Sequence, residues 1–449
     1  MFPEAVARYH DLLTDETLAE TSRTMLDEGL ERARLIFGGR RLSPYLRPHF
    51  VSEEDFSRIS TVCETVWSAI QKVKDAAISD PSIVDDLGVT DVERDLVSIN
   101  PGYKAVSPTS RLDSFLTADA YSFVELNGES PAGIAYADAA YDIFSSLPVM
   151  KKFSDDYNLR PLYGSRFMLD VLIDSYIEFL GHRPEQTPRI AIVDLAGVPT
   201  VKEFELFRDF FESSGYPAVI CTPQELEYRD KELSYRGEKI DIVYKRLLVN
   251  EYLPMMNDYP ALLHAYRAGS ICMVNSFRSK LIHKKALFAV LTDKSRAPLF
   301  STAELEAINA HVPWTRTVKD QLSDYRGNEI ELLEFIRGNS HRLVLKPNDD
   351  YGGHGITIGW STDATGWDEA IGKALSDGDY LVQERVPTAR ETFPALENGG
   401  LVFAEQLVDL DPLLFNGKVR SAFTRLSYTE LANVSSGGGM VPTYVVSKR

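Results

Sequence analysis

The chain has 449 residues, of which 44% are hydrophobic and 25% charged, a composition that excludes a mainly disordered or fibrous protein and predicts about three folded domains. Its formal net charge of −18 disfavours nucleic acid as a partner, because a phosphate backbone would be repelled. Three scattered cysteines, no signal-peptide pattern and no apolar run of about 18 residues favour a soluble cytoplasmic protein without a membrane segment or a disulfide framework.

The first hundred residues are predicted to be helical. The clearest segment is 54–77, where apolar residues recur at intervals of three and four, as on the buried face of an amphipathic helix. These residues are Phe56, Ile59, Val62, Cys63, Val66, Ile70 and Val73. Cys63 lies on this face, so we interpret it as a small core residue and not as a nucleophile.

The spacing of apolar residues changes along the chain. At 110–133 apolar and polar residues alternate in short segments, and beyond this region apolar strands alternate with a helix. Strands are predicted at 189–195, 218–221 and 240–244, with a helix at 200–214 that ends at Gly215. This alternation predicts a doubly wound parallel sheet over about 150–270. The glycine fingerprint of a dinucleotide site is absent after the first strand, so we interpret the region as substrate-binding or structural.

The remaining chain is predicted to hold a helix at 284–291, strands at 342–346 and 380–383, and a glycine-rich C-terminal segment. We therefore expect four regions: a helical region at 1–105, the first part of a core at 106–150, the parallel-sheet domain at 151–270 and the second part of the core at 271–449.

The strongest local signal is a strand that ends at Lys346 and is followed by a loop with Gly352, Gly353 and Gly355. Glycines let backbone N–H groups approach an anion, and a lysine at a strand end can neutralise a phosphate. The P-loop pattern GxxxxGK[ST] is absent, so an ordinary β-turn is the alternative. His354, inside the loop, either touches a phosphate or faces solvent.

A second signal is Arg111 with Asp113, followed by Glu125 with Asn127. Residues i and i+2 of a strand share a face, and a hairpin closed at 118–120 sets Asp113 opposite Glu125 and Phe115 opposite Phe123. Two facing carboxylates are destabilising unless a cation lies between them, and these oxygens suit Mg²⁺. The alternative is a solvated polar face of an edge hairpin.

A third signal is the strand that ends at Gln383 and Glu384, about 35 residues beyond the glycine loop. A strand of this kind can present backbone groups and a carboxylate to the edge of an adenine ring.

Taken together, the lysine strand, the glycine-rich loop and the "VQE" strand resemble the nucleotide site of ATP-grasp ligases, and Glu125-x-Asn127 resembles their magnesium motif. Here the magnesium motif precedes the lysine by more than 200 residues, as in the circularly permuted glutathionylspermidine synthase-like proteins. The runs ELNGESPAG, NSFRSKLIHKKALFAVL, LVLKPNDDYGGHGI and NVSSGGGMVPTYVV are also similar to that family. The resemblance covers most of the chain after residue 100. It implies a circularly permuted ATP-grasp fold of mixed α/β (α+β) class.

The resemblance also implies the binding residues. Lys346 and either Lys285 or its neighbour Lys284 would contact ATP phosphates, Gln383 and Glu384 would face adenine, and Mg²⁺ would be held by Asp113, Glu125 and Asn127.

Four further segments are candidates for contact with the reacting groups. The resemblance implies that Arg111 lies beside the transferred phosphoryl group and the acyl centre, with a buried ion pair with Asp113 as the alternative, and that Ser130 contacts substrate. Arg425 would reach the substrate or the phosphates, with a structural ion pair as the alternative, and Asn433 with Gly437–Gly439 would form a backbone nest or a plain turn.

The activity implied is that of an ATP- and Mg²⁺-dependent carboxylate–amine ligase that acts through an acyl phosphate and uses two small-molecule substrates, a carboxylic acid and an amine that could be cationic. The sequence has no room and no suitably placed Cys for the Cys-dependent amidase domain of bifunctional members, so we expect the resemblance to extend to the synthetase half alone. A nucleotide-binding scaffold without turnover and a small-molecule kinase are the alternatives. The sequence does not identify the acid, the amine or the oligomeric state.

Overall fold

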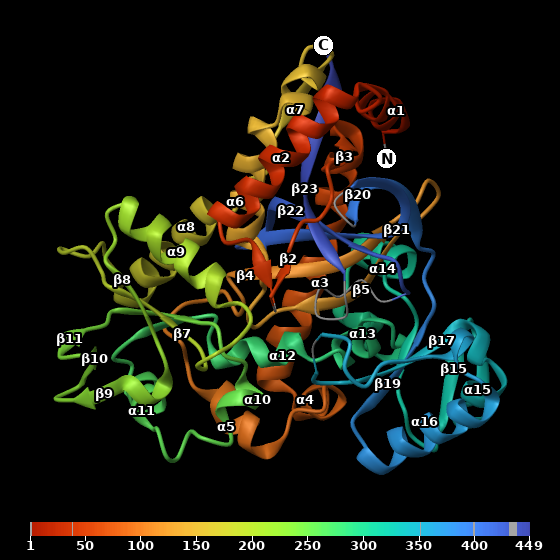
Figure 1. The fold of residues 1–449 in the computed structure, drawn as a ribbon. Coiled ribbons are helices and arrows are strands. Elements are labelled where there is room, and N and C mark those ends of the chain that lie inside the picture. The colour runs from red at the N-terminus through yellow and green to blue at the C-terminus, as the bar shows by residue number, and fades with distance from the viewer. Residues whose placement is uncertain (1, 38, 351, 398–399, 431–437) are drawn as a thin grey trace.

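The computed structural model describes residues 2–37, 39–350, 352–397, 400–430 and 438–449. Its largest sheet has eight strands, and two further sheets have four strands each (Figure 1). The parallel sheet, green in Figure 1, and the smaller antiparallel sheet, cyan to blue, lie on opposite sides below the large sheet. Among the described residues, no helix combines the length and apolar character needed to cross a membrane.

Helices dominate the N-terminal region, as predicted. They are α1 (Pro3–Leu12), α2 (Glu16–Arg32), α3 (Glu53–Ser79), α4 (Pro81–Asp86) and α5 (Asp91–Ser98), with the short strands β1 (Ile36–Phe37), β2 (Arg40–Arg41) and β3 (His49–Ser52) between α2 and α3. Helix α3 begins after Ser52, whose hydroxyl accepts a hydrogen bond from the Asp55 N–H at 3.0 Å. Its predicted apolar face is buried except for Phe56 and Val62, which are half-buried. Burial raises the pKa of Cys63 to about 12, as expected for a core thiol.

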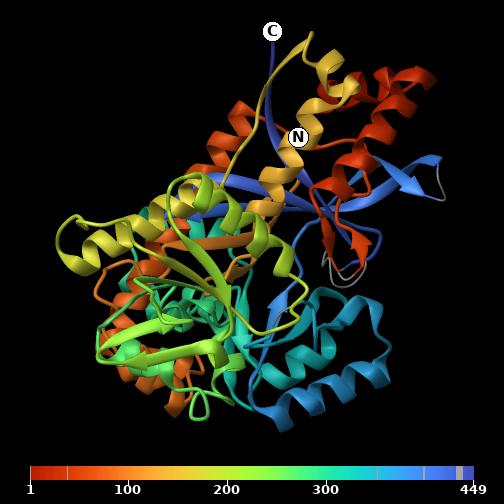
Figure 2. The ribbon, with the colours of Figure 1, turned by 60° about the vertical axis from the view of Figure 1, so that its left-hand side comes forward.

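The eight-stranded sheet joins distant parts of the chain. Its order is β3, β23 (Gly439–Lys448), β22 (Lys418–Ser427), β21 (Gly400–Phe415), β4 (Thr109–Leu116) and β5 (Tyr121–Asn127); β20 (Ala389–Glu397) pairs with β21, and β6 (Tyr157–Arg160) pairs with β23. Helices α6 (Ile134–Ser146) and α7 (Pro148–Phe153) pack beside the N-terminal helices near the C-terminus (Figure 2). Leu410 of β21 pairs with Ser114 of β4, so the C-terminal strands lie directly against the predicted hairpin.

The register of the β4–β5 hairpin is confirmed at its acidic pair and corrected beyond it. Asp113 pairs with Glu125, but a β-bulge then shifts the register by one residue. Phe115 pairs with Ser122, so the expected Phe115–Phe123 pair is wrong. The bulge leaves Val124 as the extra residue and redirects its backbone, a feature common near functional sites.

The parallel sheet is confirmed. Its strand order is β13 (Cys272–Val274), β12 (Ile242–Lys245), β7 (Ile190–Val193) and β8 (Ala218–Cys221), with all pairings parallel. Successive residues of β7 enter two different cores, one with α8 (Ser165–Leu180) and α9 (Val201–Ser213) and the other with α10 (Val249–Tyr252) and α11 (Ala261–Arg267). A small antiparallel sheet, β9 (Leu226–Arg229), β10 (Glu232–Tyr235) and β11 (Glu238–Lys239), follows β8.

The second four-stranded sheet carries the lysine strand. Its order is β14 (Thr315–Thr317), β19 (Tyr380–Glu384), β17 (Leu343–Pro347) and β18 (Thr357–Ile358). Helix α13 (Ala286–Leu291) packs on β14, and α16 (Ala364–Asp377) packs on β17 and β19, beside α15 (Leu332–Gly338) and the hairpin of β15 (Leu322–Tyr325) and β16 (Asn328–Glu331). Helices α12 (Lys280–His283) and α14 (Thr302–His311) pack against α3 and β5. Side chains of α15, α16, β17 and β19 form its own small hydrophobic core.

Candidate active site

One cavity lies where the lysine-bearing sheet meets the β4–β5 hairpin and strands β21 and β22. Most of the predicted site residues line it: Asp113, Glu125, Lys285, Lys346, Gly352, Gly353, His354, Gln383, Glu384 and Arg425. Its apolar lining comes from Phe115, Val124, Val344, Ile356, Ile358, Trp360 and Val386. A pocket with apolar walls and a few converging charges is the usual form of a small-molecule site.

Lys346 lies at the end of β17 and reaches across to the hairpin. Its Nζ donates to the carbonyl oxygen of the bulged Val124 at 3.0 Å, and no carboxylate of the described residues lies within ion-pair distance. Burial lowers the pKa of Lys346 to about 8, against the opposing effect of nearby Glu125. Gln383 points to the same place, because its amide nitrogen lies 3.2 Å from the Thr315 hydroxyl and 3.4 Å from Val124 O. A buried lysine without an anionic partner suits an anionic ligand.

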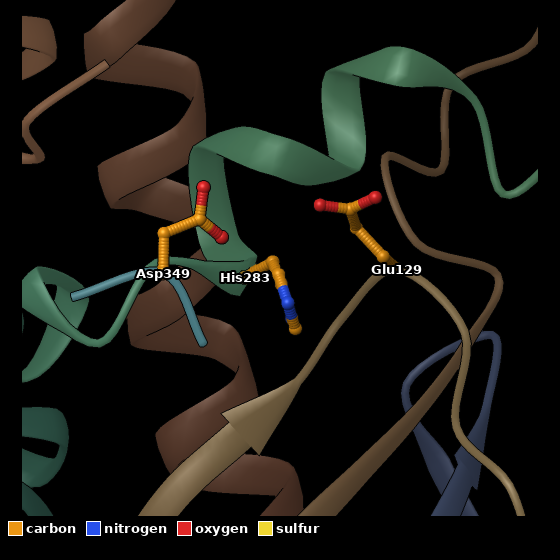
Figure 3. A group of neighbouring side chains, drawn as sticks. All are labelled: Glu129, His283 and Asp349. Carbon is orange, nitrogen blue, oxygen red and sulfur yellow. The ribbon is translucent and has the colours of Figure 1, made fainter. Parts of the chain in front are cut away.

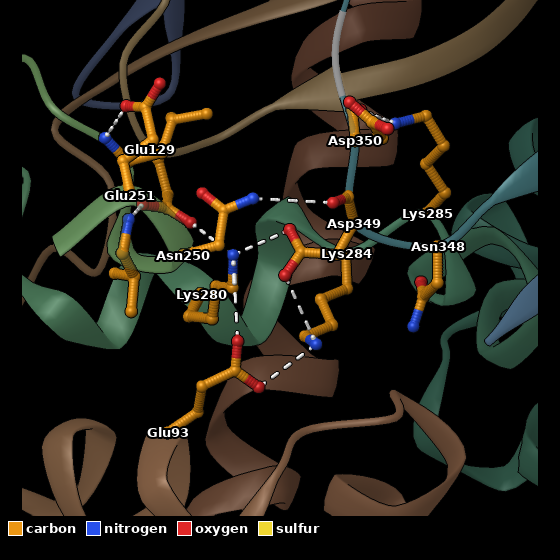
Figure 4. Close-up of polar contacts among 12 residues, drawn as sticks. Glu93, Glu129, Asn250, Glu251, Lys280, Lys284, Lys285, Asn348, Asp349 and Asp350 are labelled. Atoms are coloured by element: carbon orange, nitrogen blue, oxygen red, sulfur yellow. Dashed lines mark hydrogen bonds and ion pairs between the residues drawn. The ribbon is translucent and has the colours of Figure 1, made fainter. Parts of the chain in front are cut away.

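The two adjacent lysines of the 284–285 pair face in different directions. Lys285 lines the cavity, with its Nζ 3.5 Å from Glu125 Oε2 and donating to the Asp350 carbonyl oxygen. Lys284 is buried outside the cavity, 3.0 Å from Glu93 and 3.4 Å from Asp349 (Figure 4). The geometry therefore favours Lys285 as the lysine available to a ligand.

The glycine-rich loop follows β17 and returns in β18. Gly352, Gly353 and Gly355 have φ angles of +68°, +78° and +69°, which residues other than glycine rarely adopt. Gly352, Gly353 and exposed His354 line the cavity, whereas Gly355 packs toward Tyr380, whose hydroxyl would lie 3.0 Å from an added Cβ. The loop thus places flexible backbone beside the lysines.

The predicted metal-binding side chains converge on one face of the hairpin. The Asn127 amide nitrogen lies 3.0 Å from Asp113 Oδ1 and 3.5 Å from Glu125 Oε1, so it links the two carboxylates. Asp113 and Glu125 line the cavity, and Asn127 lies behind them. These side chains carry the hard oxygen donors that Mg²⁺ prefers, but both Asp113 oxygens already accept from Arg111 or Arg425, and the Asn127 amide would have to turn its oxygen toward the ion.

Arg111 forms the buried ion pair with Asp113 that the sequence left as an alternative. Its Nε lies 2.7 Å from Asp113 Oδ1, its Nη2 lies 3.0 Å from Oδ2, and its Nη1 donates to Ala132 O at 3.0 Å. Burial opposes ionisation of Asp113, but Arg111 and Arg425 outweigh it and lower the pKa of this carboxyl. Arg111 does not itself line the cavity but sets the position of a residue that does.

Two aspartates beside Arg425 escaped the sequence analysis. Asp409 and Asp411 share one face of β21; the Arg425 guanidinium lies 2.5 Å from Asp409 and 2.9 Å from Asp411, and 2.6 Å from Asp113. Burial raises the pKa of Asp409 to about 6 and that of Asp411 well above its usual range. The signal in the sequence was Asp-Leu-Asp, two carboxylates at strand spacing in an otherwise apolar strand.

A second group of buried charges lies next to the cavity. We call it the lysine cluster: Glu93, Glu129, Lys245, Lys280, Lys284 and Asp349, all of which except Lys245 are labelled in Figure 4. Glu129, His283 and Asp349 lie close enough to suggest a cation site (Figure 3), but the Lys280 ammonium lies 3.0 Å from Glu129 and 2.6 Å from Asp349. A lysine therefore already supplies the positive charge, and we assign no metal there.

The remaining predicted residues lie elsewhere. Ser130 is outside the cavity, between Glu129, which pairs with Lys245 at 3.3 Å, and Pro131, whose carbonyl accepts from Arg246 at 2.8 Å. Its hydroxyl is buried and has no hydrogen-bond partner among the described residues. Asn433 and Gly437 lie outside the described residues, and Gly439 begins β23.

Comparisons with known proteins support a ligase-like fold. No family model matches the chain. It is 24% identical over 240 residues to a protein of Frankia alni named as a glutamate–cysteine ligase, and 22% identical over 425 residues to a similarly named protein of Frankia casuarinae. These matches cover 51% and 89% of this chain but only 26% and 46% of the relatives, so the chain spans less than half the length of either relative.

The fold itself is shared with a solved structure. A glutathione synthetase-like effector of Globodera pallida superposes with a TM-score of 0.63 over 96% of this chain and 97% of that one, at 13% sequence identity. The chain therefore shares the mixed α/β fold of this glutathione synthetase-like effector.

Proposed function

We propose that this chain is an ATP- and Mg²⁺-dependent carboxylate–amine ligase with a circularly permuted ATP-grasp arrangement, similar to the synthetase half of glutathionylspermidine synthase-like proteins. The observation that carries the proposal is a single cavity in which Lys346, Lys285 and Gln383 meet Asp113 and Glu125 of a hairpin more than 150 residues earlier in the chain. The names of the two curated relatives, each named as a glutamate–cysteine ligase, support it.

Each group in the cavity has a role in this proposal. Lys346 and Lys285 neutralise phosphate charge, and the glycine loop lets backbone N–H groups approach it. Gln383 and Glu384 face the adenine edge, between apolar side chains that cover its ring. Asp113, Glu125 and Asn127 would hold Mg²⁺, which would supply further neutralisation of the phosphate charge.

The reaction has two steps that balance without a protein nucleophile. A substrate carboxylate oxygen attacks the γ-phosphorus, the bond to the bridging oxygen breaks, and ADP leaves with an acyl phosphate formed. The ammonium form of the second substrate first loses a proton, and the free amine nitrogen then attacks the acyl carbon. The C–O bond to phosphate breaks, inorganic phosphate leaves, and the nitrogen loses a second proton. The product is an amide, and the protein contributes position and charge.

A condensation screen tests this function. Purified protein with ATP and Mg²⁺ is incubated with pooled acids that include L-glutamate and pooled amines that include L-cysteine and alkyl diamines, and mass spectrometry detects new amides. We expect ADP and phosphate release only when both an acid and an amine are present. A kinase would release ADP with a single substrate and yield a stable phosphorylated product. Absence of calorimetric heat with millimolar ATP and Mg²⁺ would rule out the nucleotide site altogether.

A further inference from the structure

The face of the lysine-bearing sheet that meets the cavity carries its lysine at one end. Val344 of β17 pairs with Ile358 of β18 and with Gln383 of β19, and all three side chains line the cavity. They form one row across the sheet, and Lys346 follows Val344 by two residues on the same face. A phosphate held at Lys346 would thus lie at one side of a mainly apolar row.

Trp360 and Arg385 line the cavity on the other side of this row. Each comes two residues after a member of the row, on a strand that runs antiparallel to β17, so both lie on the side opposite Lys346. The Arg385 N–H accordingly donates to the carbonyl oxygen of Arg342, just before β17, at 2.9 Å. Four residues of strand separate Lys346 from this position, a distance of about 13 Å.

The two side chains form a contact pair with unused donors. The Arg385 Cζ lies 4.2 Å from the centroid of the Trp360 ring, and Arg385 is exposed and forms no ion pair with any residue that the structure describes. The Trp360 indole N–H is buried and donates no hydrogen bond to a described residue. By contrast, the indole N–H groups of Trp314 and Trp367 donate to backbone carbonyls at 2.8 and 3.1 Å. A buried donor without an acceptor costs stability, so a ligand that supplies one would be favoured.

We propose that Trp360 and Arg385 bind the nucleoside end of ATP and thereby make this chain select a nucleotide over an inorganic polyphosphate. The inference rests on the proposed ligase function and adds the residues that recognise the base and ribose of its nucleotide. With its phosphates at Lys346 and Lys285, the nucleotide would extend across the apolar row toward the pair. A base offers the flat ring that an indole contacts well, and both base and ribose carry acceptors for N–H groups.

Inorganic tripolyphosphate separates the two ends of the site, because it carries three linked phosphates and no nucleoside. Dissociation constants of ATP and of tripolyphosphate, each with Mg²⁺, are measured by calorimetry for the wild-type protein, Trp360→Leu and Arg385→Met. We expect Trp360→Leu to weaken ATP binding by about 10- to 100-fold, as for loss of one base–aromatic contact, and to change tripolyphosphate binding by no more than about twofold. Arg385→Met should weaken ATP binding by about fivefold with the same selectivity.

Trp314 gives a matched control. It directly precedes β14 of the same sheet, and its ring also contacts an arginine, with the Arg316 Cζ 5.2 Å from the ring centroid, but it does not line the cavity. Trp314→Leu should therefore leave the ratio of the two dissociation constants unchanged. Tryptophan fluorescence supplies a second readout. Trp360 is the one tryptophan among the described residues that line the cavity, so ATP should change the wild-type emission, and Trp360→Phe should largely abolish that change.

Three results would each overturn the inference: equal weakening of ATP and tripolyphosphate in Trp360→Leu, unchanged ATP affinity in that variant, or the same selective loss in Trp314→Leu. If Trp360→Leu does not fold, Trp360→Phe replaces it and should show the same selectivity with a smaller loss, because an aromatic ring remains. Wild-type protein that binds ATP through Trp360 but joins no acid to an amine would contradict the ligase function and leave this inference standing. Wild-type protein that binds no ATP would contradict both.

Discussion

The lysine cluster and the cavity are neighbouring groups of buried charge with opposite organisation. In the lysine cluster every lysine lies within 3.3 Å of a carboxylate oxygen. In the cavity the Lys346 ammonium donates to the Val124 carbonyl and forms no ion pair with a described residue, and Asp409 Oδ1 accepts no hydrogen bond from a described residue. Paired charges can hold parts of a fold together, whereas unpaired ones cost stability unless a ligand completes them.

The boundary between the two groups runs through adjacent residues. Lys284 belongs to the lysine cluster and Lys285 to the cavity; on the facing segment Asp349 belongs to the cluster, and the Asp350 carbonyl accepts from Lys285 (Figure 4). Lys284 and Asp349 thus fix the two segments through the lysine cluster, and the residues that follow them, Lys285 and Asp350, line the cavity. Substitutions on the two sides should therefore separate stability from ligand binding.

The largest effect is expected from Glu129→Ala. Glu129 is fully buried between Lys245 at 3.3 Å and Lys280 at 3.0 Å, and these two lysines lower its pKa although burial opposes them. Removal leaves buried ammonium groups without one of their partners and should cost about 3–5 kcal/mol of unfolding free energy, measured by urea denaturation. Glu64→Ala, which breaks a more exposed pair with Lys418, should cost less than about 1 kcal/mol. Equal costs for the two variants would contradict the comparison.

Arg111→Ala should act mainly on turnover. Arg111 holds Asp113, which lines the cavity, and its positive charge lies one residue behind the reacting groups, so we expect turnover to fall by about 10²–10³-fold when it is removed. ATP affinity should change by no more than about threefold. Both are measured together with melting temperature. A large loss of stability with normal activity per folded molecule would show that Arg111 serves only as a structural ion pair.

Lys346→Met should weaken ATP binding by about 100-fold in calorimetry, because a phosphate loses a charged donor in a buried site. The melting temperature of the free protein should stay the same or rise, since the substitution removes a poorly solvated charge. Lys373→Met, at an exposed pair with Asp377, serves as the control and should change neither quantity. A marked fall in stability without a change in ATP affinity would place Lys346 among the structural lysines.

Lys284 and Lys285 provide a matched pair with a smaller expected effect. Lys285→Met should weaken ATP binding by about tenfold with little change in stability. Lys284→Met should leave ATP affinity within about twofold but lower the unfolding free energy, because Glu93 and Asp349 lose a buried partner. The reverse assignment of the two effects would mean that Lys284 is the nucleotide lysine.

The smallest effect is a pH dependence. Because the folded pKa of Lys346 is about 8, below the usual lysine value, this lysine deprotonates in the folded protein before it does in the unfolded chain. Its cost to folding is therefore complete below pH 8 and is relieved as pH rises from about 8 toward the unfolded pKa. ATP affinity should fall over the same range, by up to about tenfold per pH unit, and Lys346→Met should show no such decline. Isothermal titrations between pH 7 and 9.5 provide the measurement.

Local patterns determined the regular elements of this protein. Spacing of three and four residues predicts the helix that became α3, and apolar strands that alternate with helices predict the parallel sheet, because each pattern reflects which side of one element is buried. The pairing of Asp113 with Glu125 followed from strand alternation and the turn. The bulge at Val124 did not follow from these local rules, because the Val124 carbonyl contacts Lys346, which lies more than 200 positions away in the sequence.

The candidate site divides in the same way. Motif spacing was enough to select Lys346, the glycine loop, Asp113, Glu125 and Asn127 from the sequence. Only the tertiary structure separated Lys284 from Lys285 and brought Asp409 and Asp411 to Arg425 and Asp113. Side-chain direction on a short helical segment and contacts between strands nearly 300 residues apart depend on how whole sheets pack. The arrangement of charged groups in the cavity is therefore a property of the packed fold and not of any one motif.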